Sequence, residues 1–370
     1  MGRVLLLGAF GQGNPGDEAL LRAFREGLAP HEVVAASSDP AATRRDHWCA
    51  AVPAHKPGTV LAALVRADAL VVAGGTIFKT LHASTGRHPR SLLRRSRAAI
   101  AAAHALRRPV ALVGVGAGAL PDRAARRLAV ASARAADLLI LRDEESAAVL
   151  RRAGLGSAVS VGADAAWPVL DTAPRMVESE DRVVVALSFH AGGTHLADRL
   201  AVGLAPLLAQ GIPVALQPWQ VDGTAADDRA LAARVAQQAG AGAEVLAPPR
   251  DLEEAQAQLA RARLAVSLRF HGLVAAAAAG TPTVVVDHEP KLTGLARRLG
   301  QPTVAADQLE LRLGRAVVDA LARPVIPSPA VVAEQTALAR EGFARVHVLL
   351  DRSTSGLAGA ASSRRWSPGS

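Results

Sequence analysis

The sequence is poor in the residues that stabilise small secreted proteins. Cys49 is the only cysteine, so neither an intrachain disulfide nor a zinc site built from several cysteines can form. The first ten residues hold one arginine and a short apolar stretch, which is too little for a signal peptide and instead predicts a β-strand. The uncharged run from Gly272 to Val286 is interrupted by Gly280 and Pro282 and is shorter than the roughly 20 residues that cross a bilayer. We therefore expect a cytoplasmic protein without a transmembrane segment.

Lysine and aromatic residues are also scarce. The net charge of +9 comes from arginine, because lysine occurs only at Lys56, Lys79 and Lys291. Arginine binds carboxylates and phosphates through two parallel hydrogen bonds, so the composition favours anionic ligands. Nucleic acid is not expected as a partner, since proteins that read single strands stack bases on aromatic rings, and here tyrosine is absent and aromatics make up 3%. A compositional bias towards alanine and arginine would explain the same charge.

The chain is long enough for two domains, with 370 residues of which 50% are apolar and 20% charged. Short β-branched or leucine-rich runs alternate with longer stretches of helical spacing, which predicts an α/β protein with parallel sheets covered by helices. A polar, proline-containing stretch from Asp171 to Asp181 marks a boundary. We predict two Rossmann-like domains, residues 1–172 and 181–327, then a terminal helix at 328–350 and a disordered tail at 351–370.

The expected strands are short and end in glycine or polar residues. They cover 4–7, 33–36, 69–72, 110–113, 138–141 and 158–161 in the first domain, and 183–187, 214–217, 243–246, 264–267 and 283–286 in the second. In open parallel sheets the loops at the carboxyl ends of strands form the ligand crevice, so two such domains facing each other would enclose a cleft.

The loop after the first strand contains Gly11-Gln-Gly13-Asn-Pro-Gly16, which fits the dinucleotide-binding pattern G-x-G-x-x-G, with Asp39 at the end of the second strand. The register argues against this reading, because Phe10 stands where a pyrophosphate needs glycine. The same residues indicate a tight turn followed by a well-capped helix. Asn14 can serve as the cap, Pro15 suits the first helical position, and two carboxylates follow in the first turn. A polar site that uses Asn14, Asp17 and Glu18 is the other reading.

Further glycine loops follow later strands. Gly74-Gly75 and Gly114-Val-Gly116-Ala-Gly118 would let backbone amides approach a ligand, although simple turns explain them equally well. Arg142 stands at a strand end before Asp143, where it could bind an anion or pair with a neighbouring carboxylate. The densest basic segment is a secondary candidate for the binding site of an anionic acceptor, and a solvated helix face is the alternative. It comprises Arg87, Arg90, Arg94, Arg95 and Arg97.

The sharpest constellation is Ser267-Leu-Arg269-Phe-His271-Gly272. Arg269 and His271 stand two residues apart at a strand end, so one can anchor an anion while the other moves a proton near neutral pH. A capping histidine with a structural arginine is the alternative. Lys291, after the next strand, would add a cation beside this site. The eleven histidines are scattered without a metal-binding pattern, so no metal is expected.

Taken together these segments resemble the polysaccharide pyruvyl transferase family. Gly13-Asn14-Pro15-Gly16-Asp17-Glu18 is similar to its G-N-x-G-D-E motif, and Leu141-Arg142-Asp143 with Ser146 to its R-D-x-x-S motif. Gly162-Ala-Asp164-Ala fits its G-x-D-x-A turn. The segment from Ser267 to Leu273, then Gly280-Thr-Pro282 and Pro290-Lys291, resembles its S-x-R-x-H and G-x-P-x-K signatures.

The resemblance implies a two-domain architecture like that of GT-B glycosyltransferases, and transfer of a pyruvyl group from phosphoenolpyruvate onto a sugar or glycan precursor as a ketal. Arg142 and Arg269 would bind the donor's two anionic groups, His271 would protonate its methylene carbon, and Asp17 or Glu18 would accept a proton from the sugar. Lys291 would steady the leaving phosphate, while Asn14, Gly75 and Gly116 would line the substrate site. The scheme needs no cofactor and no metal, and it accommodates a lipid-linked acceptor.

The sequence also departs from the family pattern. His190 stands where many members have an arginine, and Asp287-His288-Glu289 replaces the aromatic before Pro-Lys, which leaves the acceptor and the donor open. Two alternatives therefore stay: a GT-B glycosyltransferase that uses a nucleotide sugar, and a non-catalytic protein that binds an anionic glycan. The acidic pair usual in such glycosyltransferases is not evident, since Asp251, Glu253 and Glu254 are equally explained by helix capping.

Overall fold

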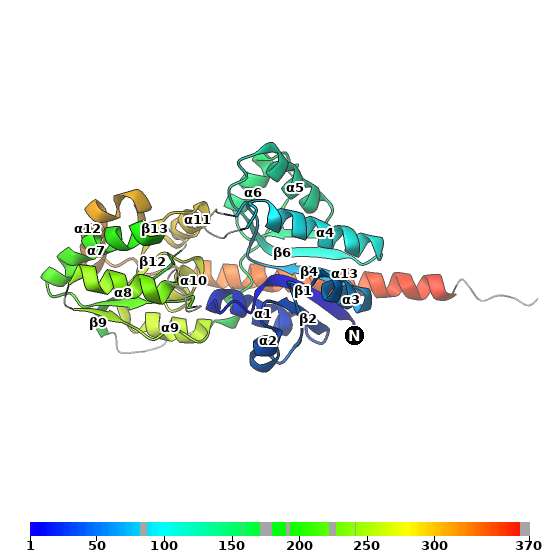
Figure 1. The fold of residues 1–370 in the computed structure, drawn as a ribbon, viewed down its shortest axis with the longest axis horizontal. Helices are drawn as coiled ribbons and strands as arrows, with labels where there is room; N and C mark the ends of the chain where they lie inside the picture. The colour runs from blue at the N-terminus through cyan, green and yellow to red at the C-terminus, as the bar shows by residue number, and fades with distance from the viewer. Residues whose placement is uncertain are drawn as a thin grey trace, which may run out of the picture.

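The computed structural model contains two parallel β-sheets flanked by helices (Figure 1). It describes residues 1–81, 87–157, 159–170, 180–189, 193–221, 227–240 and 242–362. The first sheet has the order β3-β2-β1-β4-β6-β7-β8, with β5 paired to β6, and the second has the order β11-β10-β9-β12-β13-β14. The α/β class and the parallel pairing predicted from the sequence are confirmed.

The strands agree with the predicted runs, and three short ones were not predicted. In the first sheet they are β1 (Arg3–Phe10), β2 (Glu32–Ser37), β3 (Ala50–Pro53), β4 (Ala69–Ala73), β5 (Thr76–Phe78), β6 (Val110–Ala117), β7 (Leu138–Leu141) and β8 (Ser160–Val161). In the second they are β9 (Glu180–Ala186), β10 (Val214–Gln217), β11 (Ala243–Val245), β12 (Ala262–Ser267), β13 (Thr283–Asp287) and β14 (Thr303–Ala305). The unpredicted strands β3, β5 and β14 have only three or four residues each.

Helices cover both faces of each sheet. On the first sheet, α3 (Pro57–Arg66), α4 (Ser91–Ala105), α5 (Arg123–Arg134) and α6 (Glu144–Arg152) pack on one face, and α1 (Pro15–Gly27) packs on the other, with α2 (Pro40–His47) beside β3. On the second, α7 (Gly193–Ala209), α8 (Asp228–Ala239) and α12 (Leu309–Ala322) oppose α9 (Leu252–Ala260), α10 (Phe270–Ala278) and α11 (Pro290–Leu299). Short 3-10 turns lie at Trp167–Val169 (η2) and Ala306–Gln308 (η4).

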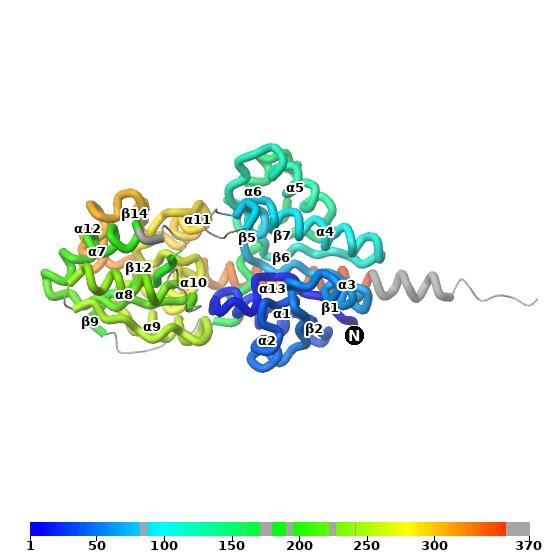
Figure 2. The backbone as a smooth tube through the Cα atoms, viewed as in Figure 1, coloured from blue at the N-terminus to red at the C-terminus, as the bar shows by residue number. Residues whose placement is uncertain are grey.

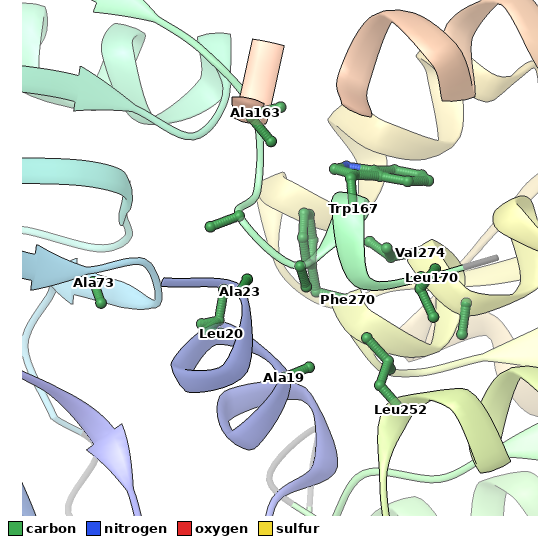
Figure 3. Close-up of a cluster of buried hydrophobic side chains, with 14 of the residues drawn as sticks. Ala19, Leu20, Ala23, Ala73, Ala163, Trp167, Leu170, Leu252, Phe270 and Val274 are labelled. Carbon is green, nitrogen blue, oxygen red and sulfur yellow. The ribbon is translucent and has the colours of Figure 1, made fainter. Parts of the chain in front are cut away.

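One hydrophobic core runs through both halves of the molecule. Ala19 and Leu20 of α1, Trp167 beside them, and Leu252, Phe270 and Val274 of the second half belong to a single buried cluster. Figure 3 shows these side chains from α1, η2, α9 and α10 gathered at the junction of the halves. Apolar burial of this kind stabilises the junction, because its energy scales with the area removed from water. The crevice loops of both sheets are thereby held in a fixed relation.

The helix starts follow from local side-chain chemistry. Asn14, Asp39, Asp122, Asp143, Asp227 and Asp251 each cap a helix by accepting a hydrogen bond from a backbone N–H in its first turn. Asp39, a candidate ribose ligand in the dinucleotide reading, therefore serves α2, since its Oδ1 accepts from the amides of Ala41 and Ala42 at 3.0 Å each.

The final helix, α13 (Pro329–Ser362), belongs by sequence to the second half but packs against the first (Figures 1 and 2). Phe343 meets Phe24 of α1 edge to face, with 5.1 Å between the ring centroids. The helix extends past Leu350 to Ser362, into the segment for which a disordered tail is predicted from the sequence. Residues 363–370 lie outside the described residues, as do residues 171–179 of the predicted boundary from Asp171 to Asp181.

Across the described ranges, none of the helices is both long and apolar enough to cross a membrane.

Candidate active site

The carboxyl ends of strands from both sheets meet at the junction of the halves. The first sheet places the loop before α1, the end of β7 and the turn after β8 there, and the second places the starts of α10 and α11. Each of these segments carries a motif singled out in the sequence. Because parallel sheets expose their ligand-binding loops at these ends, the junction is the candidate site.

His271 lies at the start of α10 and faces the first half. Its Nε2 is 3.5 Å from Oδ1 of Asp164, whose side chain is completely buried. Its imidazole also lies against Gly16, where an added Cβ would come within 2.0 Å of Nδ1. Glycine at position 16 therefore allows the ring to reach the beginning of α1, and His271 contacts two elements of the opposite half.

Arg142 crosses the junction from the end of β7. Its Nε donates to Oδ2 of Asp143 at 2.9 Å, and its Nη1 is 3.7 Å from Oδ2 of Asp164. The guanidinium stacks over the ring of Phe270, 4.1 Å from the centroid, in a cation–π contact. An added Cβ at Gly116 would come within 2.7 Å of Nη2, so that glycine makes room for the arginine. The Gly116 amide itself donates to the Gly75 carbonyl at 2.7 Å.

Asp164 lies between two cationic groups. Burial acts to raise the pKa of its carboxyl, but the attraction of His271 and Arg142 outweighs burial and lowers the pKa below its ordinary value. Asp164 is therefore an anion that holds an imidazole and a guanidinium on either side of it. Three buried polar atoms here have no hydrogen-bond partner among the described residues: Arg142 Nη2, Asp164 Oδ2 and His271 Nε2. Such atoms are costly to leave unpaired, and their clustering is typical of a functional site.

Asp17 points into the same region from the first turn of α1. Its Oδ2 accepts from Nδ2 of Asn14 at 2.8 Å, while Asn14 Oδ1 accepts from the Gly16 amide at 3.1 Å. Burial raises the pKa of the Asp17 carboxyl, and the charges of His271, Arg269 and Lys291 pull it partly back. Asn14 thus orients Asp17, and a carboxylate with a raised pKa is a better proton acceptor.

Glu18, the neighbouring carboxylate, is held within the loop around it. Its Oε1 accepts from the Gly11 amide at 2.7 Å, and its Oε2 is 2.9 Å from Nε2 of His47 on α2. These contacts fix the glycine turn and leave Asp17 as the carboxylate directed towards His271.

Arg269 is anchored on its own half. Its Nε donates to the Leu187 carbonyl at 2.5 Å, and its Nη2 pairs with the buried Asp228. Asp228 also accepts from the amides of Phe189, Trp219 and Gln220 at 2.7–3.1 Å. Of the guanidinium nitrogens, Nη1 has no hydrogen-bond partner in the described part of the chain, so one edge of Arg269 is available to a ligand.

Lys291 adds a second cation at the start of α11, where it pairs with Glu289. Burial alone would raise the pKa of Glu289, but attraction to the Lys291 ammonium lowers it to about 2. For Lys291 burial lowers the pKa, and repulsion from Arg142 and Lys79 acts in the same direction against the pull of Glu289. An additional anion would be favoured here, because it would relieve this repulsion between cations.

A cavity of about 430 Å³ opens beside this pair, between α6 and α11. Glu145, His288, Glu289, Thr293 and Arg297 are among its lining residues. Carboxylate, imidazole and hydroxyl groups of this kind form hydrogen bonds with the hydroxyl groups of sugars.

The structure thus brings together Asn14, Asp17, Arg142, Arg269, His271 and Lys291, whereas Glu18 is tied to the glycine turn and His190 lies outside the described residues. Sequence reasoning did not assign Asp164, Phe270, Asp228 or Glu289 to the site. Asp164 had a signal in the G-x-D-x-A turn, but its partners are more than twenty residues away along the chain. No cluster of three or more His, Cys, Asp or Glu residues able to hold a metal occurs in the part of the chain that the structure describes.

Solved structures with the same architecture are distant in sequence. HepE of Anabaena, solved with UDP-glucose, has 14% identity and a TM-score of 0.58, covering 97% of this chain and 100% of that one. The UDP-GlcNAc 2-epimerase of Methanocaldococcus jannaschii, solved with UDP-GlcNAc and UDP, has 12% identity and a TM-score of 0.60, with coverages of 94% and 99%. MnaA of S. aureus, solved with UDP, has 12% identity and a TM-score of 0.59, with coverages of 92% and 94%. These likenesses confirm the GT-B-like fold that the resemblance implied.

A comparison with curated proteins finds no match. The model of the polysaccharide pyruvyl transferase family, in contrast, matches residues 14–290, which include Asn14, Asp17, Arg142, Arg269 and His271 of the junction and end one residue before Lys291. On these grounds the chain belongs to the polysaccharide pyruvyl transferase family.

Proposed function

We propose that this protein transfers a pyruvyl group from phosphoenolpyruvate onto two hydroxyls of a sugar or glycan precursor in the cytoplasm, forming a ketal and releasing phosphate. The observation that carries the proposal is the convergence of a proton donor, a proton acceptor and several cations at one junction. His271 and Lys291 lie close enough to Asp17 for their charges to lower the pKa of its carboxyl, against the effect of burial. The family assignment independently supports a transferase.

Phosphoenolpyruvate carries a carboxylate and a phosphate, so its binding needs at least two cationic groups. Arg142 and Lys291 repel one another at the junction, and Arg269 keeps one nitrogen without a partner among the described residues. Charge-assisted hydrogen bonds from these groups are about twice as strong as neutral ones. We assign the phosphate to Lys291 and Arg142, and the carboxylate to Arg269.

The chemistry requires a proton to reach the methylene carbon of the donor. In the protonated form, His271 donates that proton, and the double-bond electrons form the new C–H bond, which leaves positive charge on the central carbon. A sugar hydroxyl attacks this carbon and gives its proton to Asp17. Cleavage of the C–O bond then releases phosphate with the bonding electrons and leaves positive charge on the central carbon. A second hydroxyl attacks this carbon and gives its proton to His271, which is neutral after the first step, and this closes the ketal. Asp164 favours this cycle because its carboxylate holds His271 in place and attracts its positive charge.

The acceptor would enter through the cavity beside Glu289. Its lining by Glu145, His288 and Thr293 suits a hydroxyl-rich ligand, and the family assignment supports a glycan. Asp287, His288 and Glu289 replace the family's aromatic here, so we expect an acceptor bound mainly by hydrogen bonds.

A nucleotide-sugar glycosyltransferase is the competing function, since its fold is shared and the solved relatives were crystallised with UDP ligands. The acidic residues that would hold its ligand have other partners. Asp251 caps α9, Glu254 pairs with Arg250, and Glu253 pairs with Arg22 of the first half. These contacts favour the pyruvyl transferase.

The test measures thermal stabilisation by phosphoenolpyruvate, with UDP-glucose, NAD and inorganic phosphate as comparators. A ligand present at a hundredfold excess over its Kd stabilises the folded protein by about 2.7 kcal/mol. Lys291→Met should abolish the shift from phosphoenolpyruvate, whereas the same change at the exposed Lys56 should not. His271→Asn should keep the shift but lower phosphate release with an acceptor by roughly 10³-fold. A shift with UDP-glucose alone would overturn the proposal.

A further inference from the structure

The positive charge of this protein is concentrated in one segment. Residues 87–134 contain 11 arginines and a single acidic residue, Asp122. The remaining 322 residues hold 31 basic and 32 acidic side chains, so they are almost neutral. A compositional bias towards arginine would raise the charge along the whole chain. The excess is therefore local, and it coincides with two neighbouring helices, α4 and α5.

These helices pack side by side on one face of the first sheet (Figure 1). Leu93, Ile100 and Ala103 of α4 and Ala125 and Ala129 of α5 are buried in the core beneath them. The opposite side of each helix faces solvent and exposes arginines. They are Arg94, Arg95, Arg123, Arg126, Arg127 and Arg134, and we call this surface the basic face.

Most arginines of the basic face have no acidic partner. Asp122 pairs with Arg90 at 3.3 Å. Arg94, Arg123, Arg126 and Arg127 make no side-chain hydrogen bond or ion pair within the described residues. Their charges are neither neutralised nor used to hold the fold, so this surface attracts anions strongly.

Exposed apolar side chains adjoin the basic face. Leu61 and Val65, one turn apart on α3, keep 47% and 49% of their surface exposed. Helix α3 lies on the same face of the sheet as α4. Arg95 of α4 donates to the Ala54 carbonyl just before α3 at 2.9 Å, and Arg108 just after α4 donates to the Val65 carbonyl of α3 at 3.2 Å. Basic residues beside exposed apolar ones are typical of surfaces that rest on an anionic bilayer, where the charges meet headgroups and the apolar groups enter the headgroup boundary.

We propose that the basic face binds the surface of an anionic lipid bilayer. This binding is peripheral and involves α3, α4 and α5. It does not depend on the donor or on the reaction proposed above. A bilayer is favoured over nucleic acid because the face combines arginines with aliphatic side chains and contains no aromatic residue on which bases could stack. Attachment would hold the enzyme where acceptors that carry a lipid are found.

The test measures binding of the full chain to sedimented vesicles of phosphatidylcholine, alone and mixed with phosphatidylglycerol. We expect binding only to the anionic vesicles, and we expect it to weaken as salt shortens the Debye length below about 10 Å. Each arginine near such a surface contributes about fivefold to the partition coefficient. The triple variant Arg94→Gln, Arg126→Gln and Arg127→Gln should therefore bind roughly a hundredfold more weakly.

The matched control removes three exposed arginines from the second half, with Arg229→Gln, Arg312→Gln and Arg323→Gln. This control variant has the same net charge as the first triple variant, and it should bind anionic vesicles within about twofold of the parent protein. Equal melting temperatures for both variants would show that folding is unaffected. Equal losses in the two variants would overturn the proposal, as would absence of binding by the parent protein.

A second pair of changes separates a bilayer from other polyanions. Leu61→Ser with Val65→Ser should weaken binding to anionic vesicles several-fold, because two apolar groups no longer enter the headgroup boundary. The same changes should not alter binding to a single-stranded oligonucleotide. Tighter binding to that oligonucleotide than to anionic vesicles, lost in the Arg94, Arg126 and Arg127 variant, would assign the face to nucleic acid and overturn the proposal.

Discussion

The two halves of the molecule have the same kind of sheet but contribute opposite chemistry to the junction. Residues 1–170 hold 22 basic and 13 acidic side chains, and residues 171–370 hold 20 of each. At the junction the balance differs. The basic half contributes the buried carboxylates Asp17 and Asp164 beside Arg142, whereas the neutral half contributes Arg269, His271 and Lys291.

This difference shows that the net charge of a half does not determine what it contributes to the site. The surplus arginines of the first half lie on the exposed sides of α4 and α5, and its junction carboxylates lie where strands end. Proton transfer needs a donor and an acceptor on opposite sides of the substrate, and here each half supplies one of them. The site is therefore complete only when the halves are packed together through the shared core.

The largest effect in this comparison is expected within α1, where two adjacent carboxylates have different surroundings. Asp17→Asn removes the proposed proton acceptor and should lower turnover by about 10²-fold with little change in phosphoenolpyruvate binding. Glu18→Gln keeps an oxygen for the Gly11 amide but loses the charge that pairs with His47, so it should cost about 1 kcal/mol of stability and little turnover. Phosphate release and thermal melting of both variants make the comparison, and equal loss of turnover would contradict it.

A smaller effect is expected when the contact between the halves is weakened at Asp164. Asp164→Asn keeps the shape of the side chain but removes the charge that faces His271 and Arg142. Because Arg142 retains Asp143, we expect the fold and the Kd for phosphoenolpyruvate to persist while kcat falls roughly tenfold.

The control for Asp164 is Asp251→Asn, since asparagine caps a helix about as well as aspartate and Asp251 lies at the start of α9. A tenfold rise in KM at unchanged kcat in Asp164→Asn would assign Asp164 to donor binding instead of to the positioning of His271.

The sequence was sufficient for the fold and for much of the junction, because both are specified locally. Buried β-branched runs predicted the central strands, and strand-end motifs marked Asp17, Arg142, Arg269 and His271. The family motifs occur in the expected order, and the family model matches residues 14–290. Since parallel strands align their carboxyl ends, positions far apart in sequence could be expected in one crevice.

Contacts between distant segments could not be predicted in this way. Glu18 pairs with His47 on α2, and Arg269 pairs with Asp228 on α8. Local spacing in the sequence predicts neither of these pairs. The return of α13 to the first half was missed for the same reason, because an amphipathic pattern shows that a helix buries one face but not what covers it.

The smallest predicted effect concerns His347 of α13, which is linked by hydrogen bonds to the end of α1 and, through His31, to the residue before β1. The Gly2 amide donates to Nδ1 of His31, so the proton of this ring is on Nε2, which lies 3.1 Å from Nδ1 of His347. Nε2 of His347 then donates to the Gly27 carbonyl at 3.0 Å. Both imidazoles are therefore neutral in this chain of hydrogen bonds.

Acid should weaken this link, and the sign follows from the pKa of His31. Burial lowers that pKa, and the neighbouring His347 and the positive terminal amine act in the same direction, against the negative charges of Asp351 and Asp68. The unfolded chain therefore takes up a proton more readily, so this contribution to stability is complete above the ordinary histidine pKa of about 6.5 and is lost as the pH falls below it.

Melting temperatures measured between about pH 7.5 and about pH 5.5 should fall less in His31→Gln than in the parent protein. His104→Gln, an exposed histidine on α4, serves as the control, and an unchanged pH dependence in His31→Gln would show that the pair does not link α13 to the first half in a proton-dependent way.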